Sequence, residues 1–207
     1  MHHTWKILCL YSPVGRKTLQ DCLRVVFFTL CAILQPSTED EPAFYKFVLK
    51  DISGKDVDFA QYKGKVLLLV NVASECGYTD GHYRELVQIQ DEFSSHGFTV
   101  LAFPCNQFGQ QEPNDDKGIL KFAQDRYNVN FPLFSKIDVG GEHAHPLYVY
   151  LYQVTADYPK WNFGKYLVDR NGKAVKFFSQ RITAREVAPY IELLINNKTI
   201  DSYHTDL

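Results

Sequence analysis

Cysteine is scarce in this chain of 207 residues, and its five cysteines form no recognisable framework. No two are spaced as Cys-x-x-Cys, and no cysteine–histidine set has the spacing of a structural zinc site. These absences argue against a thioredoxin-type disulfide exchanger and against a zinc module. Only Cys76 and Cys105 lie beyond the N-terminal segment, which is too few for a disulfide scaffold.

Excess charge and repetition are missing as well. The formal net charge is -2 and the basic residues are scattered, so no nucleic-acid partner is expected. No internal repeat and no low-complexity tract is visible. What is present is a composition with 45% hydrophobic residues, which fits one folded domain with room for an additional targeting segment or tail.

One apolar run, Val25–Leu34, lies near the N-terminus. Basic residues precede it and an acidic patch at residues 39–41 follows it, which is the polarity of a secretory signal or of a signal anchor. The run is shorter than the roughly 20 apolar residues that a spanning helix needs. However, no clear cleavage site precedes Pro36. We therefore predict a signal peptide or a signal anchor over residues 1–37 and a linker over residues 38–43.

The C-terminal tail, residues 197–207, complements this reading. Its last four residues, His204-Thr205-Asp206-Leu207, are similar to the signals that retrieve proteins to the endoplasmic reticulum, with Thr205 where glutamate is usual. An entry signal at one end and a retrieval-like signal at the other predict residence in the lumen of the endoplasmic reticulum. The triplet beginning at Asn197 is a glycosylation acceptor, but one such triplet is expected by chance.

Alternating and continuous apolar runs predict one domain over residues 44–196. The first half is expected to hold a hairpin of Phe44–Lys50 with Val57–Phe59, a buried strand Val66–Val72, a helix over 80–94 and a strand Phe98–Phe103. The second half is expected to hold helices over 114–127 and 145–154 and a hairpin of Tyr166–Val168 with Ala174–Phe178. The capping box of Thr183 and Glu186 then opens a last helix, which ends at about Ile195. This order indicates an α/β, thioredoxin-like fold, with a central mixed β-sheet flanked by helices and an N-terminal β-hairpin.

Cys76 lies between a buried strand and the start of a helix. A thiol at the carboxyl end of a parallel strand faces the crevice where open α/β sheets bind ligands. The free N–H groups and dipole at a helix N-terminus favour thiolate over thiol, and a thiolate can attack an O–O bond. The polar neighbours of Cys76 predict a flexible loop outside the core. The alternative is an inert buried cysteine.

Three stretches resemble the signatures of one family. Residues 71–79 read Asn-Val-Ala-Ser-Glu-Cys-Gly-Tyr-Thr, and residues 101–109 read Leu-Ala-Phe-Pro-Cys-Asn-Gln-Phe-Gly. Residues 111–113 add Gln-Glu-Pro to the second stretch, and residues 161–163 read Trp-Asn-Phe. They are similar, in the same order, to the signatures of the glutathione peroxidase family. Three long matches in order are highly specific.

The resemblance implies a catalytic group of Cys76, Gln107, Trp161 and Asn162, with no cofactor or metal. The indole N–H and the two side-chain amides are donors that do not titrate near neutral pH. They would stabilise the thiolate and the oxyanion that leaves the peroxide. The implied substrates are hydrogen peroxide or organic and lipid hydroperoxides, reduced through a sulfenic acid on Cys76.

The sequence departs from many cysteine-type relatives, because Ala123 stands where they carry a resolving cysteine. Cys105 is the remaining thiol of the domain, and it either resolves the sulfenic acid after a local rearrangement or is buried at the end of its strand. The short connection 154–160 is similar to that of monomeric members with an open active site.

The partners implied are therefore glutathione or a protein disulfide isomerase as reductant. The pattern is similar to that of the endoplasmic-reticulum members, one of which is membrane-anchored. Another function that uses the same cysteine is a peroxide sensor, or a relay that oxidises the thiols of client proteins without turnover. A catalytically dead scaffold is disfavoured by the intact residue set.

Overall fold

The computed structural model describes residues 41–201; the predicted signal segment and the last six residues of the tail lie outside this range. The elements in chain order are η1 (Ala43–Lys46), β1 (Val48–Lys50), β2 (Asp56–Asp58), η2 (Phe59–Tyr62), β3 (Val66–Val72), α2 (Thr79–Phe93), η3 (Ser94–His96), β4 (Phe98–Pro104), α3 (Asp116–Tyr127), α4 (Pro146–Thr155), β5 (Lys165–Val168), β6 (Ala174–Phe178) and α5 (Ala184–Ile195), where η denotes a 3-10 helix. None of the helices between residues 41 and 201 is both long enough and apolar enough to cross a membrane.

The central sheet has four strands in the order β4-β3-β5-β6. β3 and β4 are parallel, with Val66 opposite Phe98 and Val72 opposite Pro104, and α2 is the crossover between them. β5 runs antiparallel to β3, and β6 antiparallel to β5. This strand–helix–strand unit followed by a hairpin and a helix confirms the expected thioredoxin-like arrangement with a mixed sheet.

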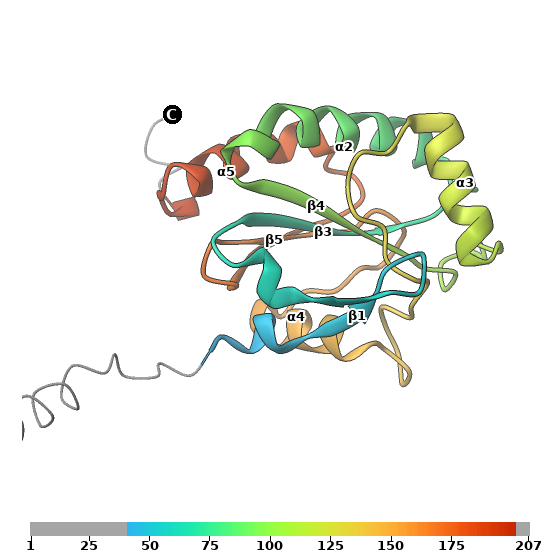
Figure 1. Cartoon of the computed structure of the whole chain (residues 1–207), viewed down its shortest axis with the longest axis horizontal. Helices are drawn as coiled ribbons and strands as arrows, with labels where there is room; N and C mark the ends of the chain where they lie inside the picture. The colour runs from blue at the N-terminus through green and yellow to red at the C-terminus, as the bar shows by residue number, and fades with distance from the viewer. Residues whose placement is uncertain (1–40, 202–207) are drawn as a thin grey trace, which may run out of the picture. The chain divides into compact units, whose positions relative to one another are not determined.

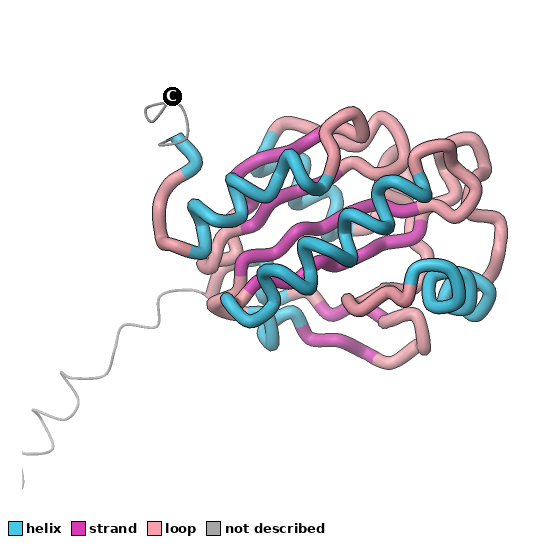
Figure 2. Tube along the Cα trace, turned by 90° about the horizontal axis from the view of Figure 1, so that it is seen from above, coloured by secondary structure: helices cyan, strands magenta, loops and turns pink. Residues whose placement is uncertain are grey.

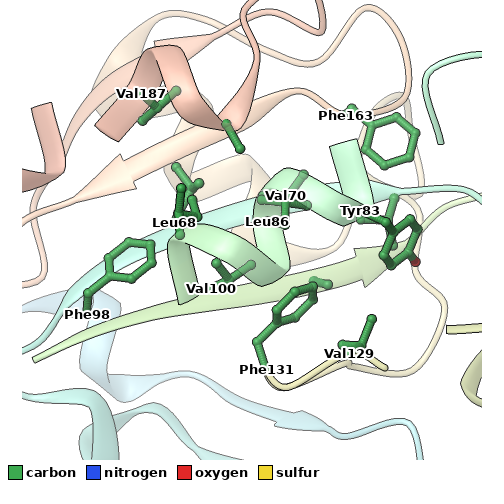
Figure 3. Packing of buried hydrophobic residues seen from close by; sticks show 14 of the residues in the cluster. Leu68, Val70, Tyr83, Leu86, Phe98, Val100, Val129, Phe131, Phe163 and Val187 are labelled. Carbon is green, nitrogen blue, oxygen red and sulfur yellow. The ribbon is translucent and has the colours of Figure 1, made fainter. Parts of the chain in front are cut away.

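Helices cover both faces of the sheet. α2 and α5 pack on one face and α4 on the other, together with the β1–β2 hairpin (Figures 1 and 2). Alternate side chains of β3 supply the two cores: Leu68 and Val70 meet α2 and α5 (Figure 3), whereas Leu67 and Leu69 meet α4. All four are fully buried, and burying each such side chain is worth about 1.5–3 kcal/mol.

The element bounds follow the sequence closely except at the N-terminus of the domain. The expected strand from Phe44 is wrong over its first residues, because residues 43–46 form the 3-10 helix η1. Phe44 and Tyr45 are both buried although they are adjacent, and a strand would send them to opposite faces. Phe44 packs on the ring of Phe59, and the Tyr45 hydroxyl donates to the carbonyl of Arg170 at 2.8 Å.

Candidate active site

Cys76 lies in loop 73–78, between the carboxyl end of β3 and the first residue of α2. Its N–H donates to the Thr79 hydroxyl at 3.1 Å, and its carbonyl accepts from the Thr79 N–H at 3.0 Å. The Thr79 hydroxyl also donates to the carbonyl of Ala73 at 2.7 Å. Cys76 is 9% exposed, so the residue is largely buried.

Two further hydrogen bonds fix the same loop. The Ser74 hydroxyl donates to Glu112 Oε1 at 2.7 Å, and the Glu75 N–H donates to the Gln111 carbonyl at 3.0 Å. Glu112 is fully buried, and this burial raises its carboxyl pKa to about 7. The expectation of a flexible loop outside the core is therefore wrong: loop 73–78 is polar, but it is bonded on both sides and Cys76 packs against the apolar core.

The Trp161–Phe163 turn is held by a buried asparagine of β3. The Asn71 side-chain amide donates to the Trp161 carbonyl at 3.0 Å, and the Asn71 backbone carbonyl accepts from the Phe163 N–H at 2.6 Å. Phe163 has a φ of 68°, which is unusual for a bulky residue. The side-chain nitrogen of Lys165, which is fully buried, donates to the Phe163 carbonyl at 2.8 Å. This hydrogen bond helps to hold Phe163 in its left-handed conformation.

Asn162 projects from this turn into the protein and is fully buried. Its amide nitrogen donates to Gln111 Oε1 at 2.9 Å and to the Phe108 carbonyl at 3.3 Å. Its Oδ1 atom is buried without a hydrogen-bond partner in the described part of the chain. A buried amide oxygen without a donor is costly, and such an atom needs an explanation in each structure.

Trp161 borders the same site. It is partly buried, packs against the core cluster that contains Cys76, and lies 6.1 Å from the Phe108 ring between centroids. A Cβ added at Gly109 would lie 3.4 Å from Trp161 and 3.5 Å from the side chain of Gln111. Trp161 and Gln111 therefore lie beside Gly109, and Gln111 links this place to Asn162 through its side chain and to the loop of Cys76 through its carbonyl.

The Gln107 side chain is bonded to a segment that precedes α4 and to Cys105. Its side-chain nitrogen donates to the Gly140 carbonyl at 2.8 Å, and its Oε1 accepts from the N–H groups of Val139 and Gly140 at 2.8 and 3.1 Å. Cys105 is a further donor to that oxygen, at 3.5 Å. These bonds use the Gln107 oxygen and one hydrogen of its amide nitrogen, so its place in the catalytic group stays a prediction.

Gln111 is a second glutamine at the site, bonded to Asn162, that sequence reasoning did not single out. It belongs to the Gln-Glu-Pro stretch of the second signature, so the signal was present, but Asn-Gln-Phe-Gly offered a second glutamine four residues earlier. The reversal that separates them includes Gly109 and Gln110, both with positive φ (67° and 54°). Two consecutive left-handed residues turn the chain in a way that apolar periodicity does not reveal.

Cys105 follows β4 and is fully buried, in the core cluster on the α4 face of the sheet. Burial raises the pKa of its thiol, which favours the protonated, unreactive form. Both cysteines of the described domain are free thiols. They belong to different core clusters, so a bond between their sulfurs would need a local rearrangement.

His82 and Lys165 form a polar pair beneath the Trp161–Phe163 turn. The His82 ring stacks on Phe163 with centroids 4.8 Å apart, and burial lowers the His82 pKa to about 4. Burial likewise lowers the pKa of Lys165 to about 7. Between residues 41 and 201, no three side chains of His, Cys, Asp or Glu are placed to hold a metal ion.

Comparison with known proteins decides the family. The family model described as glutathione peroxidase matches residues 44–152. The chain is 51% identical to human glutathione peroxidase 7 over 157 residues, which is 76% of this chain and 84% of the relative. The chain belongs to the glutathione peroxidase family. It is therefore a peroxidase, an oxidoreductase that reduces peroxides.

Two more relatives agree with this assignment. A probable phospholipid hydroperoxide glutathione peroxidase of Mesembryanthemum crystallinum is 45% identical over 163 residues, covering 77% of this chain and 96% of the relative. The crystal structure of T. cruzi GPX1 superposes with a TM-score of 0.60 at 37% identity, over 75% of this chain and 97% of that one. These matches cover nearly the whole length of both relatives.

Proposed function

We propose that this peroxidase works through the Cys76 thiolate, assisted by Trp161, Asn162 and Gln111. The sulfur attacks the peroxide oxygen that carries the proton, the O–O bond breaks, and Cys76 becomes a sulfenic acid. The other oxygen leaves as an alkoxide or hydroxide and takes up a proton to give alcohol or water. Its supporting observation is the cluster around Gly109, which brings Trp161 and Gln111 beside the buried amide of Asn162.

The roles of these side chains follow from their chemistry. The indole N–H of Trp161 donates a hydrogen bond without titrating near neutral pH, so it can stabilise the thiolate and the leaving oxyanion at any physiological pH. The two amide hydrogens of Asn162 are bonded to Gln111 and to the Phe108 carbonyl in this structure, so in our proposal Asn162 exchanges one of these bonds when the peroxide binds. The Gln111 oxygen orients the Asn162 amide through the 2.9 Å bond. Gln107, which the sequence favoured for this group, acts instead in our proposal as the support of segment 139–140.

The reductant in this proposal is an external thiol, either glutathione or a protein disulfide isomerase. One thiol displaces water from the sulfenic acid and forms a mixed disulfide with Cys76. A second thiol then releases the Cys76 thiol and leaves with the first as a disulfide. The complete burial of Cys105 and the raised pKa of its thiol support an external over an internal partner.

The proposed substrates are hydrogen peroxide and neutral organic or lipid hydroperoxides. An uncharged donor set imposes no charge requirement on the peroxide, and one relative is named for phospholipid hydroperoxides. We further propose a monomer in the lumen of the endoplasmic reticulum. That location depends on the N-terminal signal or anchor and the retrieval-like tail, both of which lie outside the described residues.

The test is peroxide consumption by the full chain, comparing wild type, Cys76→Ser and Cys105→Ser, with glutathione or protein disulfide isomerase as reductant. We expect wild type and Cys105→Ser to turn over and Cys76→Ser to be inactive. Loss of turnover in Cys105→Ser would assign resolution to that thiol. If wild type is oxidised once by peroxide but turns over with neither reductant, a sensor or relay replaces the catalytic proposal.

A further inference from the structure

We infer that Thr79 is a positioning residue, whose hydroxyl sets the conformation in which Cys76 meets the peroxide. This inference rests on the proposed function of Cys76. Thr79 has no placed role in that reaction, and the bonds it makes are to the backbone of the loop that carries the reactive sulfur. It is 4% exposed, so water cannot readily replace the partners of its hydroxyl.

The Thr79 side chain closes the Cys76 loop from both ends. Its Oγ1 accepts the N–H of Cys76 at 3.1 Å and donates to the carbonyl of Ala73 at 2.7 Å. The backbone N–H of Thr79 adds a third link, to the Cys76 carbonyl at 3.0 Å. Both backbone groups of Cys76 are therefore bonded to one residue, and the Cα–Cβ bond that directs the sulfur is fixed with them.

A hydroxyl is needed for this arrangement because one atom must accept and donate at the same time. An isosteric valine would leave the Cys76 N–H and the Ala73 carbonyl without these partners in a buried position, and each such loss is costly. The loop would then relax towards water or towards other partners. Because reactivity depends on the alignment of sulfur with the O–O bond and with the donors at Asn162, even a small shift of Cys76 reduces the rate.

The position of Thr79 also bears on how the cycle is completed. It lies three residues after Cys76, where a Cys-x-x-Cys exchanger carries its second thiol. Here that position holds a buried hydroxyl that is already bonded to the loop. Thr79 thus occupies the position at which a nearby thiol could have reduced the oxidised Cys76. This agrees with reduction by an external thiol.

The experiment compares Thr79→Val, which removes the hydroxyl at constant shape, with Thr79→Ser, which keeps it, in the full chain. The matched control is Thr99→Val. Thr99 is also buried, and its hydroxyl donates to the Phe98 carbonyl at 2.7 Å, but it lies near the start of β4, at the opposite end of the parallel strands. Three quantities are measured: the rate constant of peroxide reduction, the rate of Cys76 alkylation by iodoacetamide, and the melting temperature.

We expect Thr79→Val to reduce peroxide about tenfold to a hundredfold more slowly, while Thr79→Ser and Thr99→Val stay within about threefold of wild type. A folded Thr79→Val with a wild-type rate overturns the inference, as does a Thr79→Ser as slow as Thr79→Val. If Thr79→Val does not fold, Thr79→Ala takes its place. If neither folds, the residue serves folding and the inference is wrong.

The alkylation measurement separates this inference from the proposed function. If wild type consumes no peroxide, the proposed function fails, yet alkylation still reports how the loop presents the Cys76 sulfur. Slower alkylation in Thr79→Val than in Thr79→Ser then supports the positioning role, and equal alkylation rates in the folded variants overturn it.

Discussion

The ends of β3 and β4 form a comparison within one molecule. The two strands are parallel neighbours that finish in register, and each is followed within a few residues by a free cysteine. Cys105 comes directly after β4, and its N–H still donates to the Val72 carbonyl at 3.1 Å, as if the ladder continued. Cys76 comes four residues after Val72, once the chain has left the sheet and turned towards α2.

Because the two cysteines lie at different distances from the ends of their strands, their thiols lie in different core clusters. Cys105 remains part of the sheet edge and points into the cluster beneath α4, fully buried. Cys76 belongs to a loop tied to the start of α2 and is 9% exposed, so it is buried less completely than Cys105. The position at the end of a parallel strand is therefore not sufficient to set the surroundings of a cysteine, because the segment that follows the strand decides how completely the thiol is buried.

Alkylation rates provide the largest expected contrast between the two strand ends. In the native full chain, iodoacetamide should modify Cys76 about 100-fold or more faster than Cys105, because the thiolate is the nucleophile and burial keeps Cys105 protonated and inaccessible. The measurement is time-resolved alkylation followed by peptide mass mapping. The same reaction in denaturant is the control, and there the two rates should converge. Comparable native rates would contradict the distinction between the two strand ends.

The two glutamines that follow β4 can be compared by their effects on the rate of peroxide reduction. Gln111→Ala should lower the rate constant for peroxide reduction about tenfold to a hundredfold, because the Asn162 amide loses the oxygen that orients it. Gln107→Ala should change this rate by less than about threefold, since its amide is bonded to residues 139 and 140. Steady-state kinetics on both variants provides the measurement.

Each glutamine variant is the control for the other, because each loses one side-chain amide and the two residues lie in the same short segment. The reverse order of effects would return Gln107 to the catalytic group and assign a structural role to Gln111. Equal losses would mean that segment 139–140 and the Gly109 reversal act together on the site.

The sequence predicted the regular parts of this fold well, because their signals are local. The seven buried residues of β3, six of them apolar, and the capping box of Thr183 and Glu186 appear where they were expected. Continuous apolar runs are typical of strands buried on both faces, and cap residues act through hydrogen bonds to their own helix. The order of the elements was then enough to indicate the mixed sheet.

Where sequence reasoning failed, long-range contacts or left-handed residues decide the conformation. The η1 segment folds around Phe59 and Arg170, which lie far from it in the sequence. The different surroundings of Gln107 and Gln111 depend on the reversal at Gly109 and Gln110, which the sequence did not predict. Neither signal can be read from the periodicity of the neighbouring residues.

Glu112 lies between the two strand ends and should make stability depend on pH. Burial raises its carboxyl pKa from 4.5 to about 7, so between these values the folded chain keeps a proton that the unfolded chain has lost. The free energy of unfolding should therefore fall as pH rises through this window, by about 1–3 kcal/mol from this residue. Glu112→Gln should lack this part of the pH dependence. Chemical denaturation of both proteins at pH 5 and pH 8 measures it.

The decisive quantity is the difference between wild type and Glu112→Gln at each pH, because other groups titrate in the same range. The His82 contribution has the opposite sign, since its pKa of about 4 makes stability rise between pH 4 and 6.5. Glu75→Gln is the matched control: it removes a carboxylate from the same loop, but this residue is exposed. A Glu112→Gln protein with the same pH dependence as wild type would show that the buried carboxyl is ionised in the folded chain.

The smallest expected effect is on stability, and here the substitution of Cys105 should have the larger effect of the two cysteines. Cys105→Ser should lower the free energy of unfolding by about 1–2 kcal/mol, because it places a hydroxyl in a fully buried apolar cluster. Cys76→Ser should cost about half of this or less, since the loop around it is polar and the residue is buried less completely. Denaturant titration of both variants in parallel measures the difference. A cost for Cys76→Ser as large as for Cys105→Ser would mean that loop 73–78 belongs to the core as fully as the end of β4. The two thiols would then differ in their chemistry but not in their structural role.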